Sequence, residues 1–287
     1  MPSSAQELVS LLDLETIDLN LFRGTQPDTL LQRVFGGQVA GQALVAGART
    51  VEPEREVHSL HSYFLLPGDT AVPIVYDVER IRDGRSFSTR RIVARQHGRA
   101  IYYMTASFQV PEQGLEHQDA MPEVPAPDDS VNLGDMVAQR SPEHAEEWRR
   151  EWAALDLRWV GDSRPSGGNM PADEHPAQSR FWVRVSGNIG DDPLFHRAAF
   201  TYASDMTLLG SALIPHGFHI SHPKMQSASL DHTIWFHRPF RADEWLLYDQ
   251  VSPAATGGRG LAFGRLFTES GLLVASVAQE GLIRLRD

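Results

Sequence analysis

The sequence contains no cysteine among its 287 residues. Disulfides, thiolate nucleophiles and cysteine-based metal sites are therefore excluded. Positive charge is also scarce, because 26 Lys and Arg stand against 37 Asp and Glu and leave a net charge of −11. A nucleic-acid-binding protein needs a basic surface, so no nucleic-acid partner is expected. A local cluster of arginines can still bind an anionic ligand on an acidic protein.

Long apolar runs and address signals are missing as well. No segment approaches the length of a membrane span, and residues 1–10 lack the basic and apolar regions of a signal peptide. The ending Leu285-Arg286-Asp287 is not a peroxisomal address. We therefore expect a cytoplasmic protein. Neither a G-x-S-x-G nucleophile elbow nor a glycine-rich nucleotide motif occurs, which argues against an α/β-hydrolase and against nucleotide-binding folds.

Two patterned regions flank a segment that is rich in Pro, Asp and Glu. This composition predicts an N-terminal module over residues 1–112, a linker over 113–154 and a C-terminal module over 155–287. A short helix is expected over 144–155, at the end of the linker.

Each patterned region repeats one order of predicted elements, which is a short strand, a helix rich in small residues, and four strands. The first region has its strands at 21–24, 59–66, 74–80, 87–96 and 101–110 and its helix at 36–44. The second has its strands at 180–186, 229–236, 245–252, 261–268 and 273–280 and its helix at 205–213. This order predicts an α+β protein in which an antiparallel sheet curls around a central helix, twice. A generic α+β sandwich with chance similarity is the alternative.

The small residues have a physical reason in such a fold, because Gly and Ala let a sheet approach a helix closely. The register of the repeat is set by aligning Gly41-Gln42-Ala43-Leu44 with Gly210-Ser211-Ala212-Leu213. The two sheets are expected to join edge to edge, since that pairing protects their open edges.

Three polar residues of the second region are candidates for chemistry. Asp205 is predicted to begin the second helix, where an Asp often serves only as an N-cap. The alignment sets Gly36 opposite it, so only one region carries an acid there. Gln279 ends an apolar strand and is either a surface residue or a donor that points inward. Ser229 opens a strand, and its simplest interpretation is a turn hydroxyl.

Six segments resemble the type II acyl-CoA thioesterase family. They are residues 35–38, 57–64, 83–87, 202–205, 229–240 and 274–281. The resemblance covers nearly the whole chain outside the linker. It implies a double hotdog fold and hydrolysis of the thioester of acyl-CoA, with medium- to long-chain acyl groups as the expected substrates.

The catalytic trio of that family is an Asp, a Thr or Ser, and a Gln, which together hold a water. The resemblance places these roles on Asp205, Ser229 and Gln279. Thioester hydrolysis needs a base for the water and donors for the developing oxyanion, so these residue types fit the reaction. Backbone N–H groups near a helix start would bind the thioester oxygen. No metal or other cofactor is expected, and the histidines at 216, 219 and 222 are interpreted as a solvated loop rather than a metal site.

The resembling segments also supply candidate substrate-binding residues, namely Gly36, Gly37, His58 and Arg85. The two glycines would let the substrate approach the backbone closely. Because CoA carries phosphates, a basic patch is predicted with contributions from among Arg82, Arg85, Arg90 and Arg259.

Two other functions stay open at this point. A hotdog enoyl-CoA hydratase would carry an Asp and a His within one short helical motif, whereas the first His after Asp205 is His216. A non-catalytic acyl-CoA-binding regulator would not need the trio. A homo-oligomer is expected, because hotdog sheets commonly associate.

Overall fold

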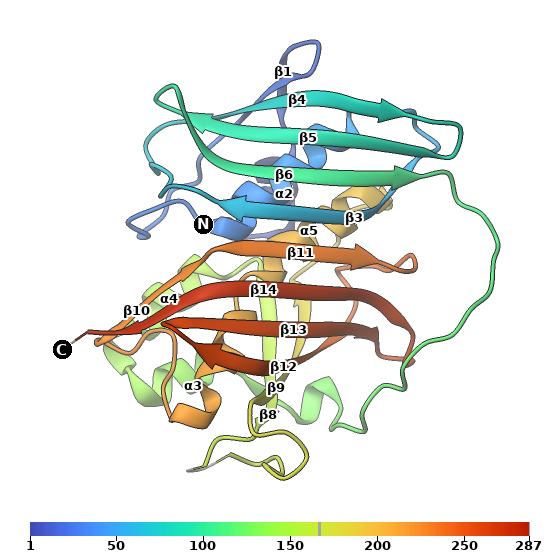
Figure 1. Ribbon diagram of the computed structural model, residues 1–287. Helices are drawn as coiled ribbons and strands as arrows, with labels where there is room; N and C mark the ends of the chain where they lie inside the picture. Colours follow the sequence, from blue (N-terminus) through green and yellow to red (C-terminus); the bar gives the residue numbers. More distant parts are fainter. Residues whose placement is uncertain (166–167, 287) are drawn as a thin grey trace.

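The computed structural model describes residues 1–165 and 168–286, with only the backbone of Arg140. The predicted C-terminal limit at Asp287 lies outside these residues. Within them the strands form one continuous 14-stranded sheet, with helices packed against its curved inner side (Figure 1). Along the sheet the strands follow the order β1-β2-β4-β5-β6-β3-β11-β14-β13-β12-β9-β8-β7, and β10 pairs with β14.

The first half of the chain follows the predicted order of elements. After helix α1 (Ala5–Leu12) come β1 (Glu15–Asp18), β2 (Leu21–Gly24), α2 (Gly36–Ala48), β3 (Glu56–Phe64), β4 (Ile74–Asp83), β5 (Phe87–Gln96) and β6 (Arg99–Gln109). In β5 every second residue is buried, which is the pattern of a strand with one face on a core. Helix α1 and the strand that follows it, β1, are not among the predicted elements.

The segment between the two regions is more structured than a plain linker. Residues 110–126, all of them described, contain no helix or strand. They are followed by η1 (Pro127–Asp129), β7 (Val131–Asn132), α3 (Leu133–Arg140), η2 (Pro142–His144) and α4 (Ala145–Glu151). Helix α4 falls within the expected short helix, and β7 pairs with β8 of the second half. The module limits at 112 and 155 stay a prediction.

The second half again places strands around a helix. Its elements are β8 (Leu155–Asp162), β9 (Gln178–Val185), α5 (Pro193–Ser204), η3 (Leu208–His216), β10 (Met225–Ser229), β11 (Asp231–Phe236), β12 (Leu246–Thr256), β13 (Arg259–Thr268) and β14 (Leu273–Leu285). The predicted strand over 229–236 is divided at Leu230 into β10 and β11.

The predicted helix over 205–213 is wrong. The central helix of the second half is α5, which ends at Ser204, and Asp205 is its C-cap residue with φ −77° and ψ −8°. Helix α5 begins after Asp192, whose side chain accepts from the N–H of Leu194, and Pro193 occupies the first turn. The alignment of 41–44 with 210–213 is therefore also wrong, because 210–213 lies in the 3₁₀ segment η3 and α5 is the partner of α2.

The two halves join at the centre of the sheet. Strand β3 pairs antiparallel with β11, and the facing residues Leu60 and Ile234 are fully buried. The predicted edge-to-edge junction is thus confirmed. It covers two strand edges that would otherwise be open.

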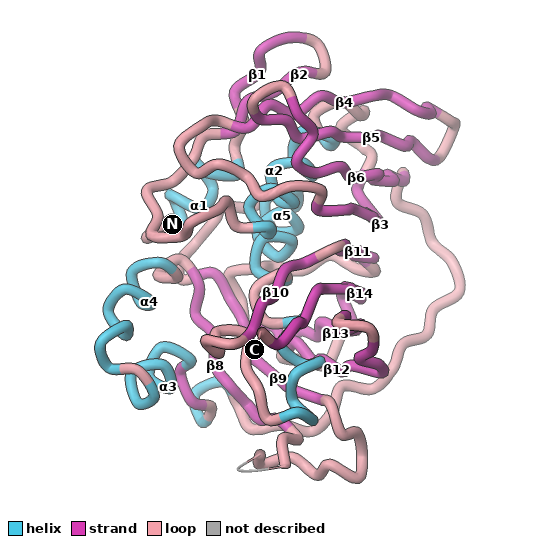
Figure 2. The backbone as a smooth tube through the Cα atoms, turned by 60° about the vertical axis from the view of Figure 1, so that its left-hand side comes forward, coloured by secondary structure: helices cyan, strands magenta, loops and turns pink. Residues whose placement is uncertain are grey.

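Helices α2 and α5 lie side by side on the inner face of this junction (Figure 2). A Cβ atom on Gly37 would collide with the carbonyl oxygen of Tyr202, and one on Gly41 would lie 3.1 Å from that of Ala198. Only glycine permits so close a contact. The pairing of 37 with 202 and 41 with 198 makes the helices antiparallel, so the start of α2 lies beside the end of α5.

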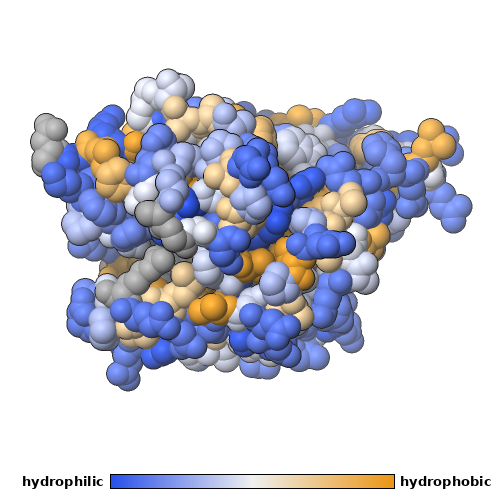
Figure 3. Space-filling model, turned by 90° about the horizontal axis from the view of Figure 1, so that it is seen from below, coloured by the Kyte–Doolittle hydropathy of each residue, from blue (hydrophilic) through white to orange (hydrophobic). Residues whose placement is uncertain are grey.

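No helix in the described part of the chain is long and apolar enough to cross a membrane. Seen from below, hydrophilic side chains predominate and the hydrophobic ones form separate patches (Figure 3).

Candidate functional site

The three predicted catalytic residues meet in space. Asp205 is supplied by the end of α5, Ser229 by the last residue of β10 and Gln279 by β14. The Ser229 hydroxyl donates to Asp205 Oδ1 at 2.8 Å, and Gln279 Nε2 donates to the same oxygen at 2.5 Å. Gln279 Nε2 also donates to Ser229 Oγ at 3.0 Å, which closes the triangle. Residues separated by up to 74 positions in the sequence thus form one hydrogen-bonded group.

The path of the strands explains why Ser229 and Gln279 are neighbours. Ser229 pairs with Gly281 of β14, two residues beyond Gln279. The N–H of Leu230 then donates to the carbonyl of Glu280, and Asp231 Oδ1 accepts from the N–H of Glu280 at 2.6 Å. These bonds hold the break between β10 and β11 beside Glu280, the residue that follows Gln279.

Asp205 also contacts the start of α2. The first turn of α2 has no hydrogen bond from a side chain of its own N-cap residue, Phe35. The N–H of Gly37 donates to the Asp205 carboxylate instead. Asp205 is therefore a helix cap, as the simplest interpretation of the sequence proposed, but it caps the helix of the other half.

Gly36 lies against Asp205 and is not its counterpart. A Cβ atom at Gly36 would stand 2.5 Å from Asp205 Oδ2 and 2.8 Å from the ring of Phe64. A glycine is thus required for the carboxylate to reach the start of α2. The partial positive charge of a helix start favours an anion at this place.

Burial raises the pKa of Asp205 from 3.8 to about 6, although the hydrogen bonds from Ser229, Gln279 and the Gly37 N–H act in the opposite direction. Two buried phenols, Tyr102 and Tyr248, interact with its charge. A carboxylate with such a pKa is ionised at neutral pH and is a stronger base than an exposed Asp.

One acceptor of the group remains unused. Gln279 is fully buried, and its Oε1 has no hydrogen-bond partner in the residues that the structure describes. Buried polar atoms are nearly always paired in folded proteins, so an unpaired one beside a carboxylate is a mark of a functional site.

Two predicted substrate-binding residues lie elsewhere. His58 is six residues before Phe64 on β3, roughly 20 Å away at the rise of a strand. Its Nε2 bonds Ser107 Oγ at 2.8 Å. Arg85 is exposed in the β4–β5 hairpin, at the right of Figure 1, whereas β3 ends and β11 begins at the left. The structure thus brings Gly36 and Gly37 to Asp205, but not His58 or Arg85.

The four arginines named for the basic patch do not all lie together on the surface. Arg90 is wrong as a surface ligand, because its side chain is 1% exposed and pairs with Asp83 at 2.6 Å. Arg82 shares the hairpin end with Arg85. Arg259 is half-exposed and pairs with Glu280, the neighbour of Gln279, at 2.9 Å. Of the four arginines, Arg259 is the one in the same part of the sheet as Gln279, although the alternation along β14 puts Glu280 and Arg259 on the opposite face.

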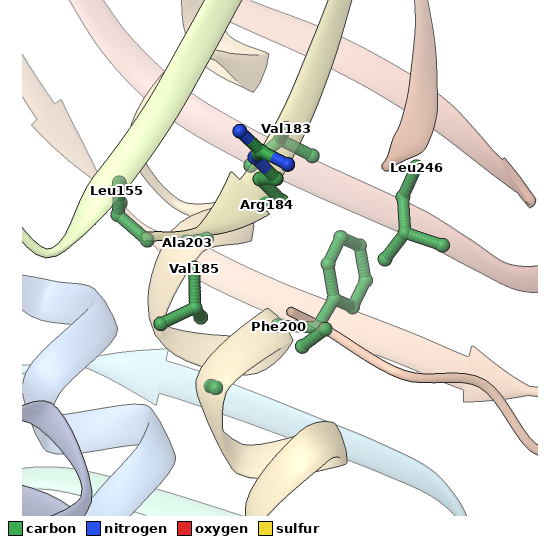
Figure 4. A pocket seen from close by; sticks show the side chains of 9 residues that line it. Leu155, Val183, Arg184, Val185, Phe200, Ala203 and Leu246 are labelled. Carbon is green, nitrogen blue, oxygen red and sulfur yellow. The ribbon is translucent and has the colours of Figure 1, made fainter. Parts of the chain in front are cut away.

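An apolar pocket lies along α5. It is lined mainly by Leu155, Val183, Val185, Phe200, Ala203 and Leu246, which converge from α5, β8, β9 and β12 (Figure 4). Ala203 precedes Asp205 by two residues in the sequence, but Asp205 does not line the pocket.

Sequence reasoning missed the aromatic residues around Asp205. Phe64, Tyr102 and Tyr248 come from three different strands, and each is partly or fully buried. The alternation along β6, where Tyr102 is in phase with Met104 and Ala106, could have indicated that Tyr102 points inward. No such signal marks Tyr248, because the first five residues of β12 are all buried.

Two family models match the chain. The one described as acyl-CoA thioesterase N-terminal domain covers residues 26–109, and the one described as acyl-CoA thioesterase covers residues 159–282. Acyl-CoA thioesterase 2 of Haemophilus influenzae is 41% identical over 290 residues, which span 100% of both chains.

Solved structures agree with these matches. Acyl-CoA thioesterase II TesB2 from Mycobacterium marinum superposes with a TM-score of 0.83 at 47% identity, covering 98% of this chain and 99% of that one. A protein from Alicyclobacillus acidocaldarius described as having a hot dog fold gives a TM-score of 0.76 at 20% identity, with 98% of each chain covered. The second likeness shows the fold alone. The α+β architecture described above is thus a double hotdog.

Proposed function

The chain belongs to the acyl-CoA thioesterase family and is an enzyme of that class, and from this premise we propose that it hydrolyses medium- to long-chain acyl-CoA through a water activated at Asp205. The observation that carries the proposal is the triangle of hydrogen bonds between Asp205, Ser229 and Gln279. The products are a free fatty acid and CoA.

In the proposed reaction Asp205 is the general base. The ionised carboxylate takes one proton from the water, while the free Oε1 of Gln279 accepts the hydrogen bond of the other. The water oxygen bonds to the thioester carbon, and the carbonyl oxygen takes the negative charge. When the carbon–sulfur bond breaks, Asp205 returns the proton to the leaving sulfur. Atoms and charge then balance without a covalent intermediate.

The developing oxyanion needs donors, and we assign them to the start of α2. The N–H of Gly37 already donates to Asp205, and the N–H of Gln38 donates to the Phe35 carbonyl. The N–H of Gly36 precedes both in the first turn, where helices leave N–H groups unsatisfied. Electrostatic stabilisation of this kind is usually a large part of catalysis.

The acyl group and the CoA moiety are assigned to different surroundings. Our candidate for the acyl end is the apolar set of side chains beside Ala203. The cavity that they enclose, about 10 Å³, has the size of a single water, so they would have to move apart to admit a chain of medium to long length. Arg259 is our candidate for a CoA phosphate. His58 and Arg85 stay predictions as substrate-binding residues, and their distance from Asp205 does not support them. Ala199, a buried residue of α5, also lines this pocket. A hydrolysis panel across acyl lengths tests this assignment, since Ala199→Phe should shift the preference towards shorter chains.

The test of the proposed function is thiol release from decanoyl-CoA by Asp205→Asn. Asn keeps the size and capping ability of Asp but is not a base, so kcat should fall by about 10²–10⁴-fold without loss of folding. Asp192→Asn is the matched control, because Asp192 caps α5 and Asn caps a helix equally well. It should keep full activity.

The same assay separates the alternatives. Hydration of crotonyl-CoA in place of thiol release would indicate an enoyl-CoA hydratase. Tight acyl-CoA binding with no turnover would indicate a regulator. Near-full hydrolysis by Asp205→Asn would make Asp205 only a cap residue and would refute the mechanism.

We further propose a homo-oligomer that acts in cytoplasmic fatty acid metabolism. Aromatic side chains exposed on the strands near the junction support association, namely Tyr63, Trp235 and Phe263. Light scattering after gel filtration tests the oligomer, and a monomeric mass at micromolar concentration would contradict it.

A further inference from the structure

The turn that carries Asp205 is held by buried polar side chains of the sheet. On one side, Ser204 Oγ bonds His232 Nε2 at 2.8 Å. On the other side, Gln250 Nε2 donates to Thr207 Oγ1 at 2.6 Å. His232 and Gln250 are both fully buried, and neither bonds Asp205, Ser229 or Gln279 in the contacts that define the catalytic group.

The hydrogen bonds of Ser204 fix the tautomer of His232. The Ser204 hydroxyl donates to the carbonyl of Thr201 at 3.0 Å, so its oxygen accepts from His232 Nε2–H. Nδ1 of His232 is then an unprotonated acceptor, buried without a partner in the described residues. Burial lowers the pKa of this imidazole to about 3. His232 is therefore a neutral donor throughout the working pH range and not an acid or base.

Gln250 is held at both ends of its amide. Ser179 Oγ donates to its Oε1 at 3.1 Å, while its Nε2 donates to Thr207. The phenol of Tyr248, two residues before it on β12, donates to the carbonyl of Ser204 at 3.3 Å. Strands β9 and β12 thus form a rigid support for the turn.

The position of Asp205 makes such a support necessary. An anion at the C-terminal end of a helix is electrostatically unfavourable, and Asp205 is the C-cap residue of α5. Its favourable partner, the start of α2, belongs to the other half of the molecule. Small movements of the turn would therefore separate the carboxylate from Gly37 and from its two donors.

We propose that His232 and Gln250 are positioning residues, which clamp the turn from Ser204 to Thr207 and so hold Asp205 in line with Ser229 and Gln279. The inference rests on the proposed role of Asp205 as the base. Neither side chain touches the substrate in this assignment; each acts through a residue of the turn.

The variants His232→Leu and Gln250→Leu remove the two clamps in turn. Each should lower kcat by about 10²-fold, the cost of a misplacement of about 1 Å, with KM little changed. The acid limb of the pH profile should also move to higher pH, because weaker hydrogen bonds to Asp205 raise its pKa. His232→Gln keeps an N–H donor and should recover part of kcat.

A second pair of variants removes the same hydrogen bonds by changing the residues of the turn. These variants serve if His232→Leu or Gln250→Leu unfolds the protein. Ser204→Ala and Thr207→Val each delete one hydroxyl with little change in volume. They should lower kcat and move the acid limb in the same direction.

The matched control is Gln42→Leu. Gln42 is also a fully buried amide, which accepts from Tyr76 at 2.7 Å and donates to the Leu11 carbonyl at 2.6 Å, away from the turn. It should lower the melting temperature without moving kcat or the acid limb. If the clamp variants behave like Gln42→Leu while Asp205→Asn is inactive, the positioning role is refuted and the proposed function stands. An active Asp205→Asn would instead refute the proposed function.

Discussion

The two ends of the α2–α5 helix pair differ in how their buried charges are satisfied. The acid Asp205 lies at the start of α2. The cationic Arg90 lies at the end of α2, next to Thr50. Arg90 uses all five of its N–H donors: on Thr50 Oγ1 and O, Asp83 Oδ1, and the carbonyls of Arg82 and Thr89. Its side chain is closed to any ligand.

The acidic end is incomplete by comparison. Gln279 Oε1 is buried and has no partner among the residues that the structure describes, and burial has raised the pKa of Asp205 to about 6. The complete set of hydrogen bonds at Arg90 suits a structural role, whereas the spare acceptor of Gln279 beside a carboxylate of raised pKa suits the functional role proposed above. The helix pair thus carries a structural end and the end to which we assign catalysis.

The largest difference between the ends is expected from deleting one hydrogen-bond donor at each. Gln279→Ala removes the amide that orients Asp205 and Ser229, so kcat should fall by about 10²-fold. At the other end, Ser88→Ala removes the hydroxyl that donates to Asp83 at 2.7 Å. Steady-state hydrolysis should be unaffected by it. Equal losses in both variants would mean that the two ends are not functionally distinct.

Two glycines of α2 provide a second pair. Gly36→Ala places a methyl 2.5 Å from Asp205 Oδ2, so it should lower kcat at least about tenfold. Gly47→Ala, near the other end, meets only the tip of Ile92 at 3.0 Å and gains helix propensity. It should leave kcat unchanged. A Gly36→Ala enzyme with normal kcat would show that the close approach of α2 is dispensable.

Removal of Arg90 should change stability and not chemistry. Arg90→Leu leaves the Thr50 carbonyl and hydroxyl without their partner, which should cost about 1–3 kcal/mol of unfolding free energy. Urea unfolding measures this cost, and kcat of the folded enzyme should equal that of the wild type. A loss of kcat at full stability would assign Arg90 a catalytic role.

Stability itself should respond to pH through Asp205. Its pKa is raised on folding, so the folded state binds more protons than the unfolded state between about pH 4 and 6. The contribution of Asp205 is therefore most favourable below pH 4 and declines by about 1–3 kcal/mol as the pH rises through 6. Comparing urea unfolding of the wild type with Asp205→Asn isolates this decline, and parallel curves for the two would contradict it.

Ser229→Thr should have the smallest effect. Thr keeps the hydroxyl that donates to Asp205 and adds one methyl. Most of kcat should remain, whereas Ser229→Ala should lose far more. Similar losses in both variants, measured by thiol release, would show that the shape of the site matters more than the hydroxyl.

The strands could be predicted from sequence far better than the second helix. The bounds of β2 and β5 follow directly from β-forming residues between turns. Helix α5 is not among the predicted elements, because the prediction relies on the similarity between residues 41–44 and 210–213. The Asp192-Pro193 pair, which is a typical helix start, indicates the true position. The burial of Arg90 was also readable, since it shares a strand face with Ile92 and Ala94.

The catalytic trio was assigned by resemblance, and its geometry could not have been derived from the sequence. The contact of Asp205 with Gly36 and Gly37 depends on the antiparallel packing of α2 and α5, which no local pattern specifies. For the same reason the sequence does not indicate how far the substrate-binding candidates His58, on β3, and Arg85, in the β4–β5 hairpin, lie from Asp205.

The most direct test of the central claim is the pH dependence of kcat/KM for the wild-type enzyme. The proposed mechanism requires the ionised carboxylate of Asp205, whose pKa burial raises to about 6. The account predicts an acid limb with a midpoint near pH 6, below which the rate falls tenfold per pH unit. A profile that stays flat down to pH 4, the range of an ordinary Asp, would contradict it.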